Sequence, residues 1–124
     1  MRGTPKMQCG AAAEDLAADY LRSRGLLVIA RNLRCRAGEL DLVCLDGAVL
    51  VIVEVRQRAD RDFGGALASV NRRKQRKLIR AAGFHWQRLA TWRSRAMRFD
   101  VIALQARPGH PPELAWIKDA FRAT

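Results

Sequence analysis

Cysteine and histidine, two residues that commonly bind zinc, are scarce in this chain of 124 residues. Its three cysteines are Cys9, Cys35 and Cys44, no two of which have the C-x-x-C spacing, and only His85 and His110 can accompany them. An odd number of cysteines without that spacing argues against a zinc site. We expect reduced thiols, as in a cytosolic protein.

Long apolar runs are also missing. The longest strongly apolar run covers residues 48–53, whereas a membrane-spanning helix needs about 20 such residues. Glu14, Asp15 and Asp19 stand where a signal peptide would be apolar. Repeats, low-complexity segments and linkers are absent, and 124 residues with 49% hydrophobic content suffice for one core. The sequence predicts a single domain over residues 1–124, cytoplasmic and not bound to a membrane.

Acidic residues are absent from one long stretch. No Asp or Glu lies between Asp62 and Asp100, although this interval contains ten Lys or Arg residues. The formal net charge is +11 and the pI is about 11.2, which implies a polyanionic partner such as nucleic acid rather than an ordinary metabolite. A ribosomal or membrane-surface protein would have the same bias, so charge alone leaves these alternatives open.

Apolar periodicity predicts an α/β chain. One helix is expected over residues 10–24, stopped by Gly25, and a second is expected from Ser69, as N-cap, towards Leu89 or Thr91. A charged, glycine-bearing loop is expected over residues 59–65. Strands are expected over residues 26–32, 39–45, 48–56 and 97–104, with a final edge strand over residues 113–118.

The pair Asp46-Gly47 between two apolar runs is typical of a tight hairpin turn. A two-residue turn there pairs Leu45 with Ala48. Counting outward from this turn sets three further pairs, namely Asp41 with Ile52, Glu39 with Glu54 and Ala37 with Arg56.

This register places Glu39, Asp41, Glu54 and Arg56 on one face of the hairpin. Asp41 and Glu54 are then close enough to hold one ion, and Mg2+ is the natural hard cation for carboxylate oxygens. The alternative is a surface ladder without metal, in which Arg56 pairs with Glu54 and Glu39. The other face is expected to be core and contains Leu40, Leu42, Cys44, Val49, Val51, Val53 and Val55.

The second helix is expected to have a basic surface. Lys74 and His85 fall on its apolar stripe, where His85 is read as a core histidine rather than a general base. A run of charge is often only a solvated face, but the absence of acids among these residues favours phosphate binding. The basic residues outside the stripe are Arg72, Arg73, Arg76, Lys77 and Arg80.

Several short motifs occur in an order that resembles the YraN family of small bacterial proteins. They are Ala13-Glu14, Arg31-Asn32, Gly38-Glu39-Leu40-Asp41, Val53-Glu54-Val55-Arg56, Lys74-Gln75 and Arg98-Phe99-Asp100. The resemblance covers nearly all of the chain. It implies a restriction-endonuclease-like core related to archaeal Holliday junction resolvases, with a mixed sheet of four to five strands flanked by helices in the order αβββαβ and an optional final edge strand.

The resemblance also implies a nuclease site. Asp41 and Glu54 match its two metal ligands for Mg2+ or Mn2+, and Glu14 matches a helix glutamate of resolvase-like members. Glu39 is then a further ligand or an outer partner of the ligands. The pair Arg31-Asn32 is expected to shape the site or to touch phosphate, and a homodimer is inferred by analogy with resolvases.

Arg56 departs from the family pattern, which has lysine at this position. A lysine can lose its proton and orient the attacking water, whereas a guanidinium stays charged and only donates hydrogen bonds. Lys74 is a candidate to orient the attacking water in place of the missing lysine. The alternative is that the Lys74 stem lies on the apolar stripe and its ammonium group only reaches solvent.

Three functions are therefore weighed. The favoured function is a metal-dependent endonuclease that hydrolyses phosphodiester bonds in structured nucleic acid, with DNA favoured and RNA as the alternative. Its catalytic site is expected to contain Glu14, Asp41, Glu54, Arg56 and Lys74. The alternatives are a non-catalytic nucleic-acid-binding module on the same fold and a basic assembly factor bound to ribosomal RNA.

Overall fold

A computed structural model describes residues 5–58 and 69–123 of the chain. Five strands form one mixed sheet in the order β1-β2-β3-β4-β5. All neighbouring strands are antiparallel except β3 and β4, which are parallel. Their bounds are Leu27–Cys35 for β1, Gly38–Asp46 for β2, Val49–Arg58 for β3, Met97–Arg107 for β4 and His110–Phe121 for β5. This α/β architecture agrees with the restriction-endonuclease-like core that the resemblance implied.

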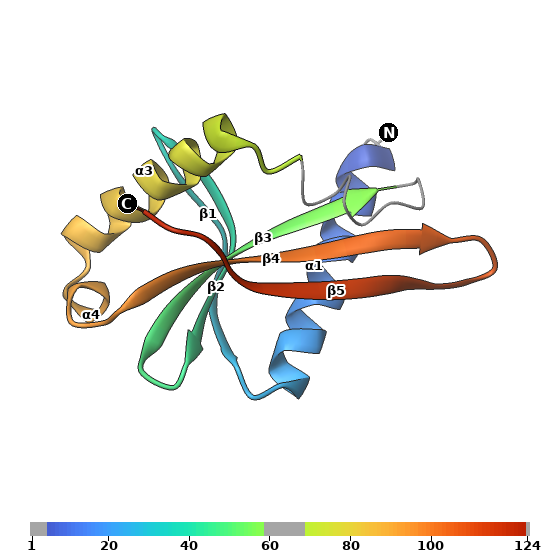
Figure 1. The fold of residues 1–124 in the computed structure, drawn as a ribbon, viewed down its shortest axis with the longest axis horizontal. Helices are drawn as coiled ribbons and strands as arrows, with labels where there is room; N and C mark the ends of the chain where they lie inside the picture. The colour runs from blue at the N-terminus through green and yellow to red at the C-terminus, as the bar shows by residue number, and fades with distance from the viewer. Residues whose placement is uncertain (1–4, 59–68, 124) are drawn as a thin grey trace.

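Helices cover both faces of the sheet (Figure 1). Helix α1 (Pro5–Ser23) lies on one face, and α3 (Arg72–Arg88) with the short α4 (Ala90–Arg93) lies on the other. None of the helices in the described part of the chain is long and apolar enough to cross a membrane. The loop expected over residues 59–65 lies outside the described residues.

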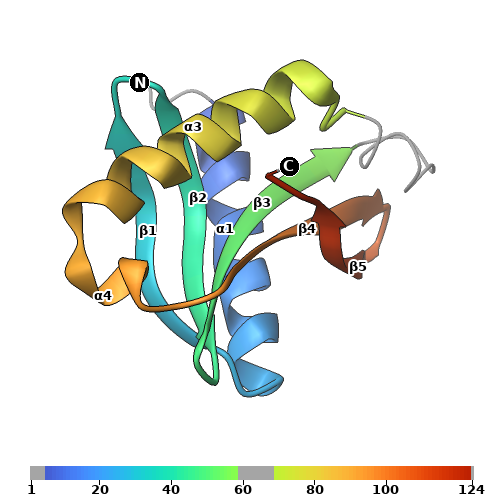
Figure 2. The ribbon, with the colours of Figure 1, turned by 60° about the vertical axis from the view of Figure 1, so that its left-hand side comes forward.

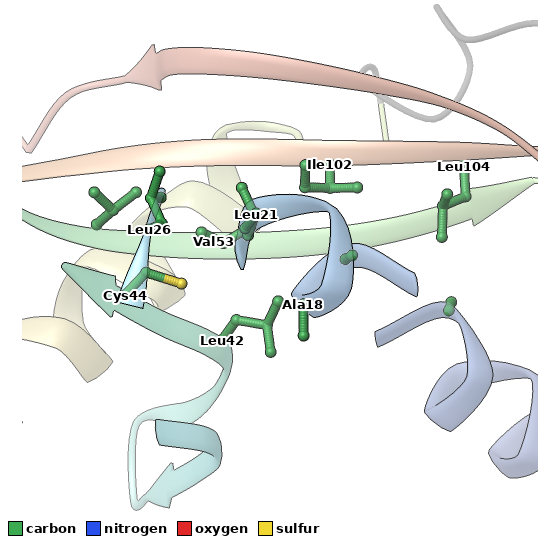
Figure 3. Close-up of a cluster of buried hydrophobic side chains, with 11 residues drawn as sticks. Ala18, Leu21, Leu26, Leu42, Cys44, Val53, Ile102 and Leu104 are labelled. Carbon is green, nitrogen blue, oxygen red and sulfur yellow. The ribbon is translucent and has the colours of Figure 1, made fainter. Parts of the chain in front are cut away.

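Each face of the sheet has its own apolar core. Beneath α1, side chains from the helix interlock with those of β2, β3 and β4, as Figure 3 shows for Leu21, Leu42 and Val53. Beneath α3 a second cluster contains Val43, Ile52 and other buried residues. The prediction of a single core face on the hairpin was therefore wrong, because α3 also removes the second face from water.

The long second helix begins later than expected. Its N-cap is Asn71 rather than Ser69, and the Asn71 side chain accepts a hydrogen bond from the Lys74 N–H at 2.9 Å. The helix ends at Arg88 because Leu89 is extended, and α4 continues the chain. The last strand is longer than predicted and includes Asp119 to Phe121, where Phe121 stacks on Phe99 at a centroid distance of 4.9 Å.

The hairpin between β2 and β3 has a different register from the predicted one. Asp46 pairs with Val49, so the turn residues are Gly47 and Ala48, and Gly47 has a φ of +61°. Glycine adopts this conformation without steric cost. Asp46 is also held by Arg98 of β4, with Nη1 to Oδ2 at 3.0 Å. The new register moves every pair by two residues and brings Asp41, rather than Glu39, level with Glu54.

Buried Asp100 joins β4 to β5. Its side chain is fully buried and accepts hydrogen bonds from the Arg98 guanidinium (3.0 Å), Trp116 Nε1 (2.9 Å) and the Asp119 N–H (2.9 Å). The Asp119 contact occurs where the chain takes a φ of +52°. A buried carboxylate is tolerated when it is hydrogen-bonded and paired in this way.

We predict that Asp100→Asn lowers the free energy of unfolding by about 3 kcal/mol, because the Arg98 guanidinium loses its buried counter-charge and one acceptor is replaced by a donor. Urea denaturation at neutral pH measures this. Asp19→Asn is the control, since among the described residues Asp19 pairs only with Arg22, on the exposed surface of α1, and its effect should stay below about 0.5 kcal/mol. Similar losses for the two variants would show that the Asp100 contacts do not hold the strands together.

Candidate metal-binding site at a fork in the sheet

The pairing between β2 and β3 ends just before the predicted site. The last paired residues are Leu42 and Val53, and beyond them the two strands separate (Figure 2). At this fork Asp41 Oδ2 accepts a hydrogen bond from the Val55 N–H at 2.9 Å. The carboxylate of Asp41 thus takes the place of a backbone carbonyl, and it lies between the two strands.

The strand alternation also breaks at this point. Leu42 packs in the cluster beneath α1, while Leu40 packs in the cluster beneath α3. Asp41 nevertheless also points to α1, where its carboxylate approaches Glu14. On β1 the residue Asn32 has a φ of +51° and donates a side-chain hydrogen bond to Glu14. Consecutive residues therefore face α1 on β2, and the left-handed Asn32 distorts the adjoining strand.

Three carboxylates meet on the α1 side of the fork. Single oxygens of Glu14, Glu39 and Asp41 all lie within 4.8 Å of one another. Glu14 comes from α1, and the other two come from β2. Glu39 is also paired with Arg34, its cross-strand neighbour on β1, at 2.7 Å.

Glu54 reaches the fork from the other side. It is only 4% exposed, and Val55 after it packs beneath α1, so Glu54 points towards α3. Its Oε2 lies 3.1 Å from Arg56 Nη2 and 3.6 Å from Lys74 Nζ. Its Oε1 is buried, and no donor among the described residues reaches it. The expectation that Glu39, Asp41, Glu54 and Arg56 share one face was therefore wrong. At the fork, carboxylates from both faces of the sheet lie close together.

The acids at the fork hold protons more tightly than usual. Burial, and then the negative charge of Asp41, raise the pKa of Glu54 to about 8, although Lys74 and Arg56 oppose this. Burial also raises the pKa of Asp41 and of Glu14. Asp41 and Glu54 are within hydrogen-bonding reach, so a proton on Glu54 can be donated to Asp41. The fork thus disfavours charge on these acids, chiefly because they are buried.

This donor set fits a hard divalent cation. Mg2+ and Mn2+ prefer carboxylate oxygens, and Mg2+ commonly uses one or two of them. Glu14, Glu39 and Asp41 offer three clustered oxygens, and Glu54 Oε1 is a buried oxygen that no donor in residues 5–58 and 69–123 reaches. Glu54 is not part of the cluster formed by Glu14, Glu39 and Asp41. Asp41 therefore connects this cluster, on the α1 side, with Glu54 on the α3 side.

The pair Arg31-Asn32 lies against the acids of α1. Arg31 Nη2 is 2.7 Å from Asp15 and 3.9 Å from Glu14, and Asn32 donates to Glu14. These contacts join Glu14 to β1, and the expected role of the pair in shaping the site stays a prediction. Contact of either residue with phosphate stays a prediction. The contribution of Asp15 was missed, although its position beside Glu14 on the helix was a signal.

The basic residues of α3 separate into two groups. Lys74 turns inward to Glu54, while the others stay exposed and form no ion pair with any acid in residues 5–58 and 69–123. His85 is buried against the rings of Phe84 and Trp92, as a core histidine should be. Arg88 lies at the end of the helix, and the other five exposed basic residues are called the α3 basic surface below: Arg72, Arg73, Arg76, Lys77 and Arg80.

Comparison with known proteins identifies close relatives. The model of the uncharacterised protein family UPF0102 matches residues 13–104. A UPF0102 protein of Pseudomonas syringae pv. syringae is 46% identical over 121 residues, covering 98% of each chain. Another, from Pseudomonas entomophila, is 49% identical over 112 residues, covering 90% of this chain and 91% of the relative. Both matches extend over nearly the whole chain.

We predict that the free energy of unfolding contains a contribution from Glu54 that is lost as pH rises. Its pKa is 4.5 in an ordinary setting and about 8 in the folded protein. The folded state therefore binds the proton more tightly, and stability should fall between about pH 5 and 8. Glu54→Gln, which cannot titrate, should flatten this slope, most clearly above pH 6, in urea denaturation with EDTA.

The matched control for this measurement is Glu113→Gln. Glu113 is an exposed glutamate whose ion pair with Arg107 is long, at 3.8 Å, so its removal should leave the slope unchanged. If Glu54→Gln keeps the wild-type slope between pH 6 and 8, Glu54 is ionised in the folded protein.

Proposed function

The chain belongs to the uncharacterised protein family UPF0102, the YraN family, and we propose that it is a metal-dependent phosphodiesterase acting on structured nucleic acid. The observation that carries this proposal is the position of Asp41. Its side chain lies in the fork between β2 and β3. There it is close to Glu14 and Glu39 and also within hydrogen-bonding reach of buried Glu54. Such a site suits a cation that must also meet a phosphate.

In this proposal Asp41, Glu14, Glu39 and Glu54 hold Mg2+ or Mn2+. The bound cation would lower the pKa of water and stabilise charge on the phosphate. A deprotonated Glu54 is needed for ligation, and Arg56 and Lys74 both favour that state by facing its Oε2. Raised pKa values at the fork support the proposal, since perturbed groups cluster at functional sites.

Arg56 and Lys74 have different capacities. The Arg56 guanidinium keeps its proton and can only donate hydrogen bonds or balance charge. Lys74 contacts the same Glu54 oxygen, its side chain is about one third exposed, and it comes from a different element. A lysine at this place can orient a water molecule, so we assign to Lys74 the role that the family pattern gives to lysine at position 56.

The α3 basic surface is the proposed contact for the phosphate backbone. Its five cations are exposed and free of described acids, and unpaired surface cations bind phosphate with a strong dependence on salt. DNA is favoured and RNA is the alternative. A homodimer is included by analogy with resolvases, because a branched substrate offers two equivalent strands.

We predict that Mn2+ stabilises the protein and that Asp41→Asn abolishes this effect. Removing the charge of Asp41, which is close to all three other carboxylates, should strongly lower the affinity for Mn2+. Nucleic-acid binding through α3 should persist. A thermal shift titration with Mn2+ measures the first effect, and titration of the nucleic acid in EDTA measures the second. Cleavage of junction, flap and single-stranded substrates with Mn2+ should be lost in the variant. Asp19→Asn, on the exposed surface of α1, should behave as wild type.

Two results would count against this proposal. One is a wild-type protein with no Mn2+-dependent shift and no cleavage of any of these substrates. The other is cleavage by Asp41→Asn at the wild-type rate, which would remove Asp41 from the site.

We further predict that Lys74→Met lowers the cleavage rate about 100-fold, as commonly follows the loss of one well-placed catalytic group. The Mn2+-dependent shift in melting temperature should persist because Lys74 is not a ligand, although it should be smaller at neutral pH because Lys74 no longer lowers the pKa of Glu54. Lys77→Met is the control, since Lys77 lies one turn further along α3 on its exposed side. Equal losses in the two variants would assign Lys74 to phosphate binding only.

A specific observation favours a second candidate function, a nucleic-acid-binding module without catalysis. Arg56 and Lys74 already neutralise one oxygen of Glu54, and the raised pKa of Glu54 lets a proton balance the rest. A metal-free fork could then be a stable structural feature. Binding with no response to Mn2+ would favour this candidate.

A further inference from the structure

A groove runs beside the α3 basic surface, between α3 and the turn that joins β1 to β2. Its volume is about 970 Å³, and it is open to solvent along its length. Figure 2 shows α3 passing over this end of β1 and β2. The groove is lined by Arg36 and Ala37 of the turn and by Ile79, Arg80, Gly83, Phe84, Gln87 and Arg88 of α3.

The lining is positively charged. Arg36, Arg80 and Arg88 come from two separate elements, and no acid is among the described lining residues. Arg36 and Arg80 also form no ion pair with the described acids. Three unbalanced guanidinium groups around one groove attract an anion, and the planar group of arginine suits phosphate.

The groove also contains a flat stacking surface. The guanidinium carbon of Arg88 lies 3.6 Å from the centroid of the Phe84 ring, and Arg88 Nη1 donates to the Phe84 carbonyl at 3.2 Å. The hydrogen bond fixes the guanidinium over the ring, so the pair is preorganised. Aromatic rings and arginine planes are the surfaces on which unpaired bases stack.

The stack is continuous with the α3 basic surface. Arg73, Lys77, Arg80, Phe84 and Arg88 follow one another at spacings of three or four residues and so share one side of the helix. From Arg73 to Arg88 this track is about 22 Å long. At its other boundary the turn that carries Arg36 leads directly into β2 and Glu39.

We propose that this groove binds an unpaired segment of nucleic acid, with a base on the Phe84–Arg88 stack and neighbouring phosphates at Arg36 and Arg80. This inference rests on the proposed function and narrows its substrate to nucleic acids that carry single-stranded nucleotides. A duplex does not satisfy the site, because its bases are stacked within the helix and their faces are covered. The unpaired segment then extends from the groove towards the carboxylates at the fork.

The test compares single-stranded and duplex binding in EDTA. The full-length protein is titrated into a single-stranded oligonucleotide of about 12 nucleotides that contains 2-aminopurine. The same titration is done with the duplex of that sequence. Phe84→Leu and Arg88→Ala should each weaken single-strand binding about 10-fold, as stacking by one base predicts. Both should reduce the 2-aminopurine quenching and leave duplex affinity within about two-fold, because the α3 basic surface is intact.

Arg24→Ala is the matched control. The Arg24 guanidinium also lies over an aromatic ring, that of Tyr20 at 5.0 Å, but at the end of α1 away from the groove. The Arg24→Ala substitution removes the same charge and the same type of stack as Arg88→Ala. Because Arg24 lies outside the groove, single-strand and duplex affinities should both stay near wild type.

Three outcomes would overturn the inference. One is unchanged single-strand binding in both groove variants, and another is an equal loss for single strand and duplex, which would reveal only phosphate contacts. The third is an equal effect of Arg24→Ala. Arg88→Ala is decisive if Phe84→Leu lowers the melting temperature, because Arg88 is exposed. Because the binding test is done in EDTA, its result does not depend on metal-dependent cleavage. If Mn2+ binds but the groove variants bind single strands as the wild type does, the groove proposal is refuted and the proposed metal site is not.

Discussion

The hydrogen bond from the Val55 N–H to Asp41 Oδ2 is the contact on which the site depends. At this point β3 has lost its backbone partner on β2, and the carboxylate satisfies a donor that would otherwise be buried and unpaired. The two strands can therefore separate while this donor stays hydrogen-bonded. Their separation makes room for Glu14 from α1 and leaves Glu54 facing α3, so one side-chain contact converts a hairpin into a site with contributions from four elements.

Burial and charge oppose each other at this fork. Four acids lie close together, and burial raises the pKa of Glu14, Asp41 and Glu54. Lys74 and Arg56 offset only part of this cost, because both face Glu54 Oε2. A net charge of +11 helps to hold the remaining negative charge, and the same positive field attracts phosphate. Helix α3 serves both purposes, with Lys74 directed inward and the α3 basic surface directed outward.

Sequence reasoning located most elements and failed at their relative placement. Local apolar periodicity correctly predicted β4 from Met97 and the order of helices and strands. The register of the hairpin was wrong by two residues, because Asp-Gly marks a turn but does not say which residues close it. Ser69 was a plausible N-cap, yet Asn71 two residues later performs that role. Both errors concern a choice between neighbouring polar residues, which tertiary contacts such as Arg98 with Asp46 decide.

The sequence alone determined the positive charge, the type and order of the elements, the absence of a zinc pattern and the four acids worth examining. These depend on composition and local periodicity, which need no knowledge of distant contacts. Only the tertiary structure decided that the acids meet from both faces of the sheet. Strand alternation assigns each side chain to a face, but left-handed Asn32 and the intrusion of Asp41 between the strands interrupt that alternation. The packing of α1 and α3 against opposite faces then determines which acids and cations meet, because these contacts join residues far apart in the chain.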